Sequence, residues 1–183
     1  MGMFPGLYLA GNHIITPWSQ VSIGPASVSQ GGTALGGTLA STVFPAANDA
    51  LFIPFQLSES VTVKRVGWAN GATVSGNVDM GVYDLAGTRI FSTGSTAQSG
   101  VSGIQVVDIT DVVIGPGNFY MALACDNITA TFARGTVGSL ARLRMFCGVL
   151  KQATAFALPA AATFATPTDD YVPVMALFLQ TAG

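Results

Sequence analysis

The scarcity and placement of charged side chains constrain this chain more than any other feature of its sequence. Only 9% of its 183 residues are Asp, Glu, Lys or Arg, whereas soluble domains usually have about a quarter. The first charged residue along the chain is Asp49. Hydrophobic residues make up 50% of the chain and the formal net charge is −2, which excludes intrinsic disorder, because disorder needs low hydrophobicity and high net charge. We therefore expect much of the surface to face another polypeptide rather than water.

The uncharged beginning of the chain predicts an N-terminal arm, residues 1–50, that makes oligomer or particle contacts. Glycine pairs at 31–32 and 36–37 make it a poor helix, and its apolar residues make it too hydrophobic for a free linker. These side chains would promote aggregation in water, so we expect a neighbouring subunit to cover them. The residues expected at this contact are Phe4, Leu7, Tyr8, Leu9, Ile14, Ile15 and Trp18.

From residue 51 onward, short runs with a period of two residues predict β-strands. Val78, Met80 and Val82 form one such run, and the segment 84–87 then turns the chain, which makes this the clearest hairpin in the sequence. The run at 171–180 is apolar in both phases, so we expect it inside a sheet or at a subunit contact. The pattern predicts an all-β fold: an antiparallel β-sandwich or jelly roll, residues 51–183, with an extended N-terminal arm.

A low-charge insertion at about residues 135–170 interrupts this rhythm of strands. It is rich in Ala, Thr and Phe, it has a weak helical signal within 137–151, and the prolines that follow keep the rest of it open. We expect it, like the arm, to contact another polypeptide. The residues expected there are Phe156, Leu158 and Phe164.

The composition also excludes several classes of partner and compartment. A pI near 5.0 and seven basic residues leave no basic surface for nucleic acid. Each apolar run is broken before it reaches the length of a membrane span, so we expect no membrane partner. No basic stretch precedes an apolar run near residue 1, so we expect no secretory signal. Cys125 and Cys147 are accordingly expected to be reduced, buried residues.

Few residues could support catalysis or bind a metal. His13 is the only histidine and Glu59 the only glutamate, so neither a Ser-His-Asp triad nor a pair of glycosidase carboxylates stands out. Cys125 alternates in phase with Leu123 and its neighbours, which favours a core position over a nucleophile. The acidic clusters at 108–111 and 126–127 follow no metal-loop spacing. We therefore predict a protein that is not an enzyme and has no catalytic, cofactor-binding or metal-binding residues.

Carbohydrate binding is the remaining chemical alternative, because β-sandwiches can stack sugar rings on exposed aromatic side chains. The candidates are Trp68, Tyr83, Tyr120 and Tyr171. Trp68 lies in register with Val66, and the tyrosines fit the faces of a sheet, so packing in the core is the favoured interpretation for this set.

The middle of the chain resembles a known class of proteins through its turn and strand motifs. These are Trp68-Ala69-Asn70-Gly71, Gly76-Asn77-Val78-Asp79-Met80-Gly81-Val82-Tyr83-Asp84, Gly87-Thr88-Arg89, Ser92-Thr93-Gly94-Ser95-Thr96 and Gly115-Pro116-Gly117-Asn118-Phe119-Tyr120. Residues 51–133 and the last strand are similar to a β-sandwich module of tailed-bacteriophage structural proteins. The resemblance implies a multimeric virion component attached to head or tail, and it implies no catalytic residues.

These observations lead to one functional expectation and one alternative. We expect a non-enzymatic virion structural protein, a homotrimer whose sandwich decorates or stabilises the capsid like a cement protein, with phage capsid or tail proteins as its other partners. Such a protein is assembled in the host cytoplasm and resides in the virion. The alternative is a tail or fibre component that binds a receptor or host-surface glycan through loops near residues 92–103.

Overall fold

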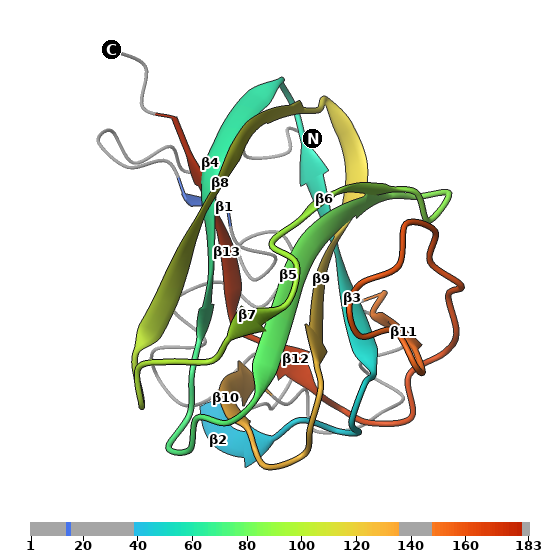
Figure 1. Cartoon of the computed structure of the whole chain (residues 1–183). Helices are drawn as coiled ribbons and strands as arrows, with labels where there is room; N and C mark the ends of the chain where they lie inside the picture. Colours follow the sequence, from blue (N-terminus) through green and yellow to red (C-terminus); the bar gives the residue numbers. More distant parts are fainter. Residues whose placement is uncertain (1–13, 16–38, 136–147, 181–183) are drawn as a thin grey trace.

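The computed structural model describes residues 14–15, 39–135 and 148–180, and every regular element in these ranges is a β-strand (Figure 1). All strand pairs are antiparallel. No helix of the described residues is long and apolar enough to cross a bilayer. The prediction of an all-β antiparallel fold is confirmed.

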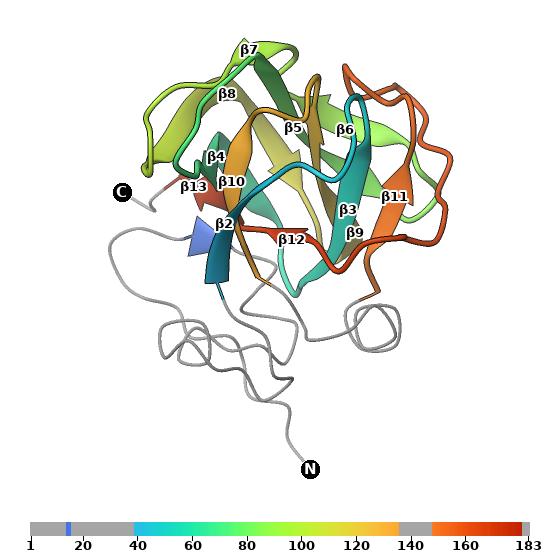
Figure 2. The ribbon, with the colours of Figure 1, turned by 90° about the horizontal axis from the view of Figure 1, so that it is seen from below.

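The strands form three sheets, of which two face each other as a sandwich (Figure 1). Sheet I has the order β1 (Ile14–Ile15), β13 (Met175–Leu179), β4 (Val61–Ala69) and β8 (Ile104–Ile114). Sheet II has the order β11 (Leu150–Gln152), β3 (Ala50–Leu57), β9 (Gly117–Cys125), β5 (Asn77–Asp84) and β6 (Arg89–Ser92), with β7 (Thr96–Ala97) also paired to β5. Sheet III, which closes one end in Figure 2, has the order β12 (Val172–Pro173), β10 (Thr131–Gly135) and β2 (Leu39–Val43).

The main core fills the space between sheets I and II. Alternation supplies its residues: Val78, Met80 and Val82 of β5 are fully buried there, because side chains two residues apart share one face of a strand. On β4 the buried phase changes between Val63 and Val66. The register with both neighbouring strands shifts near this point, as a β-bulge requires.

A second apolar cluster covers the outer face of sheet II. Phe52, Tyr83, Ala122 and Ala124 point away from the main core and are buried under residues 153–165 of the same chain. We call this segment the strap; Figures 1 and 2 show it beside β3 and β11. Gly81 lets it approach closely, because a Cβ there would lie 2.5 Å from the Phe91 carbonyl oxygen and 3.1 Å from Leu158 Cδ1.

The predicted hairpin joins β5 to β6. Asp84 closes the turn through its backbone, which pairs with Thr88, and through its carboxylate, which accepts the Thr88 N–H at 2.8 Å. Gly87 has a φ of +87°, a left-handed conformation in which a side chain would be strained. Local turn chemistry therefore fixes this element as the sequence predicts.

The boundary of the N-terminal arm differs from the predicted one. Residues 39–43 form β2, which pairs with β10, and Phe44 is completely buried among Phe132 and Tyr171. The structure therefore places residues 39–44 within the fold, as a paired strand followed by a core residue. The remainder of the arm, apart from the two residues of β1, lies outside the described residues.

The insertion also differs in its local structure from the weak helical signal. Residues 150–152 form β11 at the edge of sheet II, and residues 136–147 lie outside the described ranges. Its two ends lie together, because Gly135 pairs with Val172 and Arg134 with Pro173. The insertion thus leaves sheet III, pairs with sheet II through β11, and returns to sheet III.

Candidate functional site

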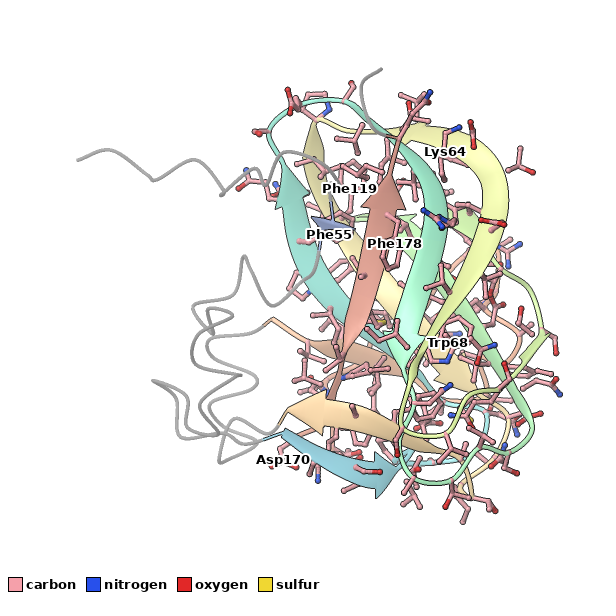
Figure 3. All side chains as sticks on the ribbon, turned by 90° about the vertical axis from the view of Figure 1, so that its left-hand side faces the viewer. Phe55, Lys64, Trp68, Phe119, Asp170 and Phe178 are labelled. Atoms are coloured by element: carbon pink, nitrogen blue, oxygen red, sulfur yellow. The ribbon has the colours of Figure 1, made fainter. Side chains whose placement is uncertain are left out.

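The outer face of sheet I is the part of the described surface with the most exposed apolar side chains on one sheet. We call it the open face. Its residues point away from the main core on three neighbouring strands, and they are Arg65, Gly67 and Ala69 on β4, Ile104, Val106 and Asp108 on β8, and Ala176 and Phe178 on β13. Figure 3 looks onto this face, with Phe178 on β13.

The centre of the open face is apolar. Ile104 is 70% exposed and Val106 43%, and Val106 lies opposite Gly67 in the β4–β8 register. Gly67 leaves room for the Phe178 ring, because a Cβ at this position would lie 3.0 Å from Phe178 Cε2 and 2.9 Å from the Gln105 carbonyl oxygen. The ring therefore lies across β4 toward Val106 and joins the apolar residues of three strands into one surface.

Charges border this apolar centre with opposite signs on neighbouring strands. On β4, Arg65 lies 5.9 Å over the Phe178 ring, and its Nε is 3.8 Å from Asp108 Oδ1 on β8. Next to them, Lys64 Nζ is 3.2 Å from Asp111 Oδ2. All four side chains are substantially exposed, Asp108 at 88%, so these ion pairs contribute little to the stability of the fold.

β8 is the outermost strand of sheet I in the described part of the chain. Its first half, from Ile104 to Asp108, pairs regularly with β4. Beyond it, the three residues of β8 between Asp108 and Val112 lie opposite the single residue of β4 between Arg65 and Val63. Bulges of this kind protect edge strands from pairing with other chains. The regular half has no such protection, and it contains the most exposed apolar residue of the face.

The outer face of sheet II is closed by three polar contacts to the strap. Asp79 accepts the Leu158 N–H at 2.9 Å, Arg89 donates to the Leu158 carbonyl, and Tyr83 donates its hydroxyl to the Pro159 carbonyl at 2.7 Å. Burial raises the pKa of Asp79, and the Leu158 N–H partly offsets this. The Phe164 ring of the strap also packs edge-to-face against the Phe52 ring, with 5.0 Å between the ring centroids. The two outer faces of the sandwich are therefore covered unequally.

A polar groove of about 530 Å³ separates the edges of the two sheets. Arg89, Ser92 and Thr93 line it from the side of β6, and Asp108 and Thr110 from β8. Only two of these residues belong to the 92–103 loop that the sequence predicts for glycan contact.

The rest of that loop is held by a network of amides. Asn70 Oδ1 accepts the Trp68 Nε1–H at 3.0 Å and Gln98 Nε2 at 2.9 Å, while its Nδ2 donates to the Gly100 carbonyl at 3.2 Å. Gln105 Oε1 accepts the Ser99 N–H at 2.7 Å. No buried side-chain nitrogen or oxygen of the described residues lacks a partner, so the network serves the loop's conformation and leaves no buried group aimed at a ligand.

The predicted contact residues of the insertion pack against their own chain. Leu158 is 2% exposed within the second cluster, so its surface is already covered by sheet II and is not available to another polypeptide in this fold. Phe156 and Phe164 are partly buried against the same cluster, and their contact with a partner stays a prediction. The strap's apolar composition is explained by this burial.

The predicted contact residues of the arm lie mostly beyond the described ranges. Ile14 and Ile15 form β1, which pairs with Phe178 and Leu177 at the edge of sheet I. Phe4, Leu7, Tyr8, Leu9 and Trp18 are outside the described residues, as are His13 and Cys147. Their predicted roles stay predictions.

The side chains considered for chemistry have structural roles where they are described. Burial raises the pKa of the Cys125 thiol to about 11, and this residue lies in the main core as predicted. Burial alone would raise the pKa of Asp126, but hydrogen bonds from Asn77 and Asn127 hold it below its usual range. In residues 14–15, 39–135 and 148–180, no three His, Cys, Asp or Glu side chains converge as metal ligands.

The aromatic candidates for sugar stacking are buried with one exception. Trp68, Tyr83 and Tyr171 are at most 4% exposed, which confirms the interpretation of these three as core residues. Tyr120 is partly buried and stacks against Phe164 of the strap at 4.9 Å. None of the four presents a free ring face comparable to the open face of sheet I.

Sequence reasoning identified β8 as a strand but missed the open face. The signal was present: Ile104 and Val106 are apolar in one phase of the strand, and Val107 and Ile109 in the other. Because both phases are apolar, the pattern alone cannot say which phase the core takes.

Comparisons with known proteins add little to these observations. No family model matches the chain, and no curated protein matches it. Among solved structures, a similar one is chitosan-binding module 1 of a chitosanase/glucanase from Paenibacillus sp. IK-5, at 14% identity over 68% of this chain and 90% of that chain, with a TM-score of 0.32. A similarity at this level carries no argument about the function of the present chain.

Proposed function

We propose that the protein is a non-enzymatic structural subunit of a tailed-bacteriophage virion, a homo-oligomer, expected to be a trimer, that decorates or stabilises the capsid. The observation that carries the proposal is the unequal covering of the sandwich. The chain covers the outer face of sheet II with its own strap, while the open face of sheet I keeps Ile104 and Val106 exposed. A surface that is apolar and continuous over three strands is typical of a protein contact.

Burial of the open face against another polypeptide would be favourable in free energy. Full burial of a single aliphatic or aromatic side chain contributes about 1.5–3 kcal/mol, and Ile104, Val106 and Phe178 forgo part of this in an isolated subunit. Contact with another polypeptide would recover it. The resemblance of residues 51–133 to phage sandwich modules supports the virion as the setting of that contact.

Purified phage particles test this proposal. We expect the protein to co-purify with particles of the phage that encodes it, and quantitative mass spectrometry gives its copy number per particle. Particles that lack it should lose their genome at a lower temperature if it stabilises the capsid. Absence of the protein from washed, infectious particles would contradict the proposal, whereas a few copies per particle would move it from the capsid to the tail.

The polar groove between β6 and β8 supports a second candidate, a tail or fibre module that binds a host-surface glycan. Its hydroxyl, guanidinium and carboxylate groups are of the kinds that bind sugar hydroxyls. A glycan array with the purified full chain tests it: saturable binding that the free sugar competes away, and that Thr110→Lys abolishes, would favour this candidate. Val101→Lys, an exposed position outside the groove, is the matched control. The buried aromatic candidates make it the weaker of the two.

A further inference from the structure

The charged side chains at the open face are separated by sign between two neighbouring strands. This separation restricts which partners could bind the face. Arg65 of the open face and the adjoining Lys64 are cations on β4, and Asp108 of the open face and the nearby Asp111 are acids on the neighbouring β8. The four charges balance, and they border an apolar centre. A partner of one charge sign would be repelled along one of the two strands, so a matching partner must present both signs in the same spacing.

We infer that the open face binds a second copy of this chain, with β4 of one copy facing β8 of the next. A second copy presents the same two rows of charge, so the acids of one copy can meet the cations of the other while the apolar centres pack together. This inference rests on the proposed function, in which the protein is a homo-oligomer. Contact between the open faces of two copies is two-fold symmetric and joins copies in pairs, so it does not by itself build the expected trimer.

The ion pairs at the open face are weak enough within one chain to exchange partners with a second copy. Arg65 and Asp108 are 3.8 Å apart within one chain, a long ion pair, and the Asp108 side chain is 88% exposed. Exposed ion pairs of this kind hold their partners weakly. The regular half of β8, Ile104 to Asp108, carries the exposed Ile104 and Val106 next to these ion pairs.

Charge-reversed variants of the full chain test the inference through complementation. In one variant, Lys64→Glu and Arg65→Glu make the charges of the face all acidic; in the other, Asp108→Lys and Asp111→Lys make them all basic. By sedimentation velocity, we expect the wild type to self-associate, each variant alone to associate at least about tenfold more weakly, and an equimolar mixture to regain association. Circular dichroism melts check that each variant folds.

A matched pair of lysine variants tests the apolar centre of the open face. Ile104→Lys should abolish self-association, and Leu85→Lys, an equally simple change at a site 55% exposed on the β5–β6 turn of sheet II, should leave it intact. A wild type that stays monomeric, a mixture that does not complement, or equal effects of the two lysine variants would each overturn the inference. A protein found in particles whose self-association survives Ile104→Lys would refute this contact and leave the proposed function standing. A protein that self-associates through the open face but is absent from particles would do the reverse.

Discussion

The thiol of Cys125 is placed at the end of β9 with its side chain in the main core. Burial raises its pKa to about 11, and the thiolate is the reactive form of cysteine. Near pH 8, therefore, we expect iodoacetamide to leave Cys125 unmodified in the folded protein and to alkylate it readily in denaturant, as peptide mass spectrometry would measure. Rapid native alkylation at this position would show that the core opens at the end of β9.

Asp79 is a fully buried carboxyl group whose pKa is raised by burial. The folded state then holds the proton more tightly than the unfolded state, so the free energy of unfolding falls as pH rises from the usual Asp range through the raised pKa. We expect Asp79→Asn, which retains an acceptor for the Leu158 N–H, to remove this pH dependence. Urea denaturation of both proteins across mildly acidic pH measures it, with Asp169→Asn at an exposed position as the control; parallel curves for wild type and Asp79→Asn would contradict the expectation.

At the scale of elements, the strap buries the outer face of sheet II, so that both faces of this sheet are shielded from water. Its backbone pairs with the hairpin, since the Arg89 N–H donates to the Ala160 carbonyl at 2.9 Å and the Ala162 N–H to the Gly87 carbonyl at 2.7 Å. Leu158 is its most deeply buried large side chain. The two ends of the strap meet beside β11, where the backbones of Lys151 and Ala165 pair.

We predict that Leu158→Ala destabilises the protein by about 2–5 kcal/mol through the cavity that it creates. Limited proteolysis should then cut within residues 153–165 faster than in the wild type, which mass mapping of the fragments would show. Leu85→Ala, the same substitution at an exposed site, should change the stability by less than about 0.5 kcal/mol. Equal effects of the two substitutions would mean that the strap is not packed on sheet II.

At the scale of the whole molecule, the sandwich has one outer face covered by the chain and one left open. If the open face joins copies, folding and association are linked, and the melting temperature depends on protein concentration. We predict that the Tm of the wild type rises with concentration and that the Tm of Ile104→Lys does not, as scanning calorimetry over a wide dilution series would show. A concentration-independent Tm for both proteins would indicate that the sandwich is stable alone.

The sequence by itself determined the all-β class, the β5–β6 hairpin and the core positions of Trp68 and Cys125, because strand periodicity and turn residues act over a few neighbouring positions. It assigned the apolar residues of the insertion to a contact with another polypeptide, whereas Leu158 packs on sheet II of its own chain. It could not identify that packing, since Leu158 and Asp79 are 79 residues apart in the chain and only the packed fold joins them.

The tertiary structure decided which apolar side chains enter the core and which stay exposed. Residues 39–44 belong to the fold, because β2 pairs with β10 and Phe44 enters the core, whereas the sequence assigned them to an arm. Both phases of β8 are apolar, and only the packing of sheet I on sheet II selects Val107 and Ile109 for the core and leaves Ile104 and Val106 outside. Hydrophobic free energy depends on the area removed from water, and that area is fixed by contacts between strands far apart in the chain.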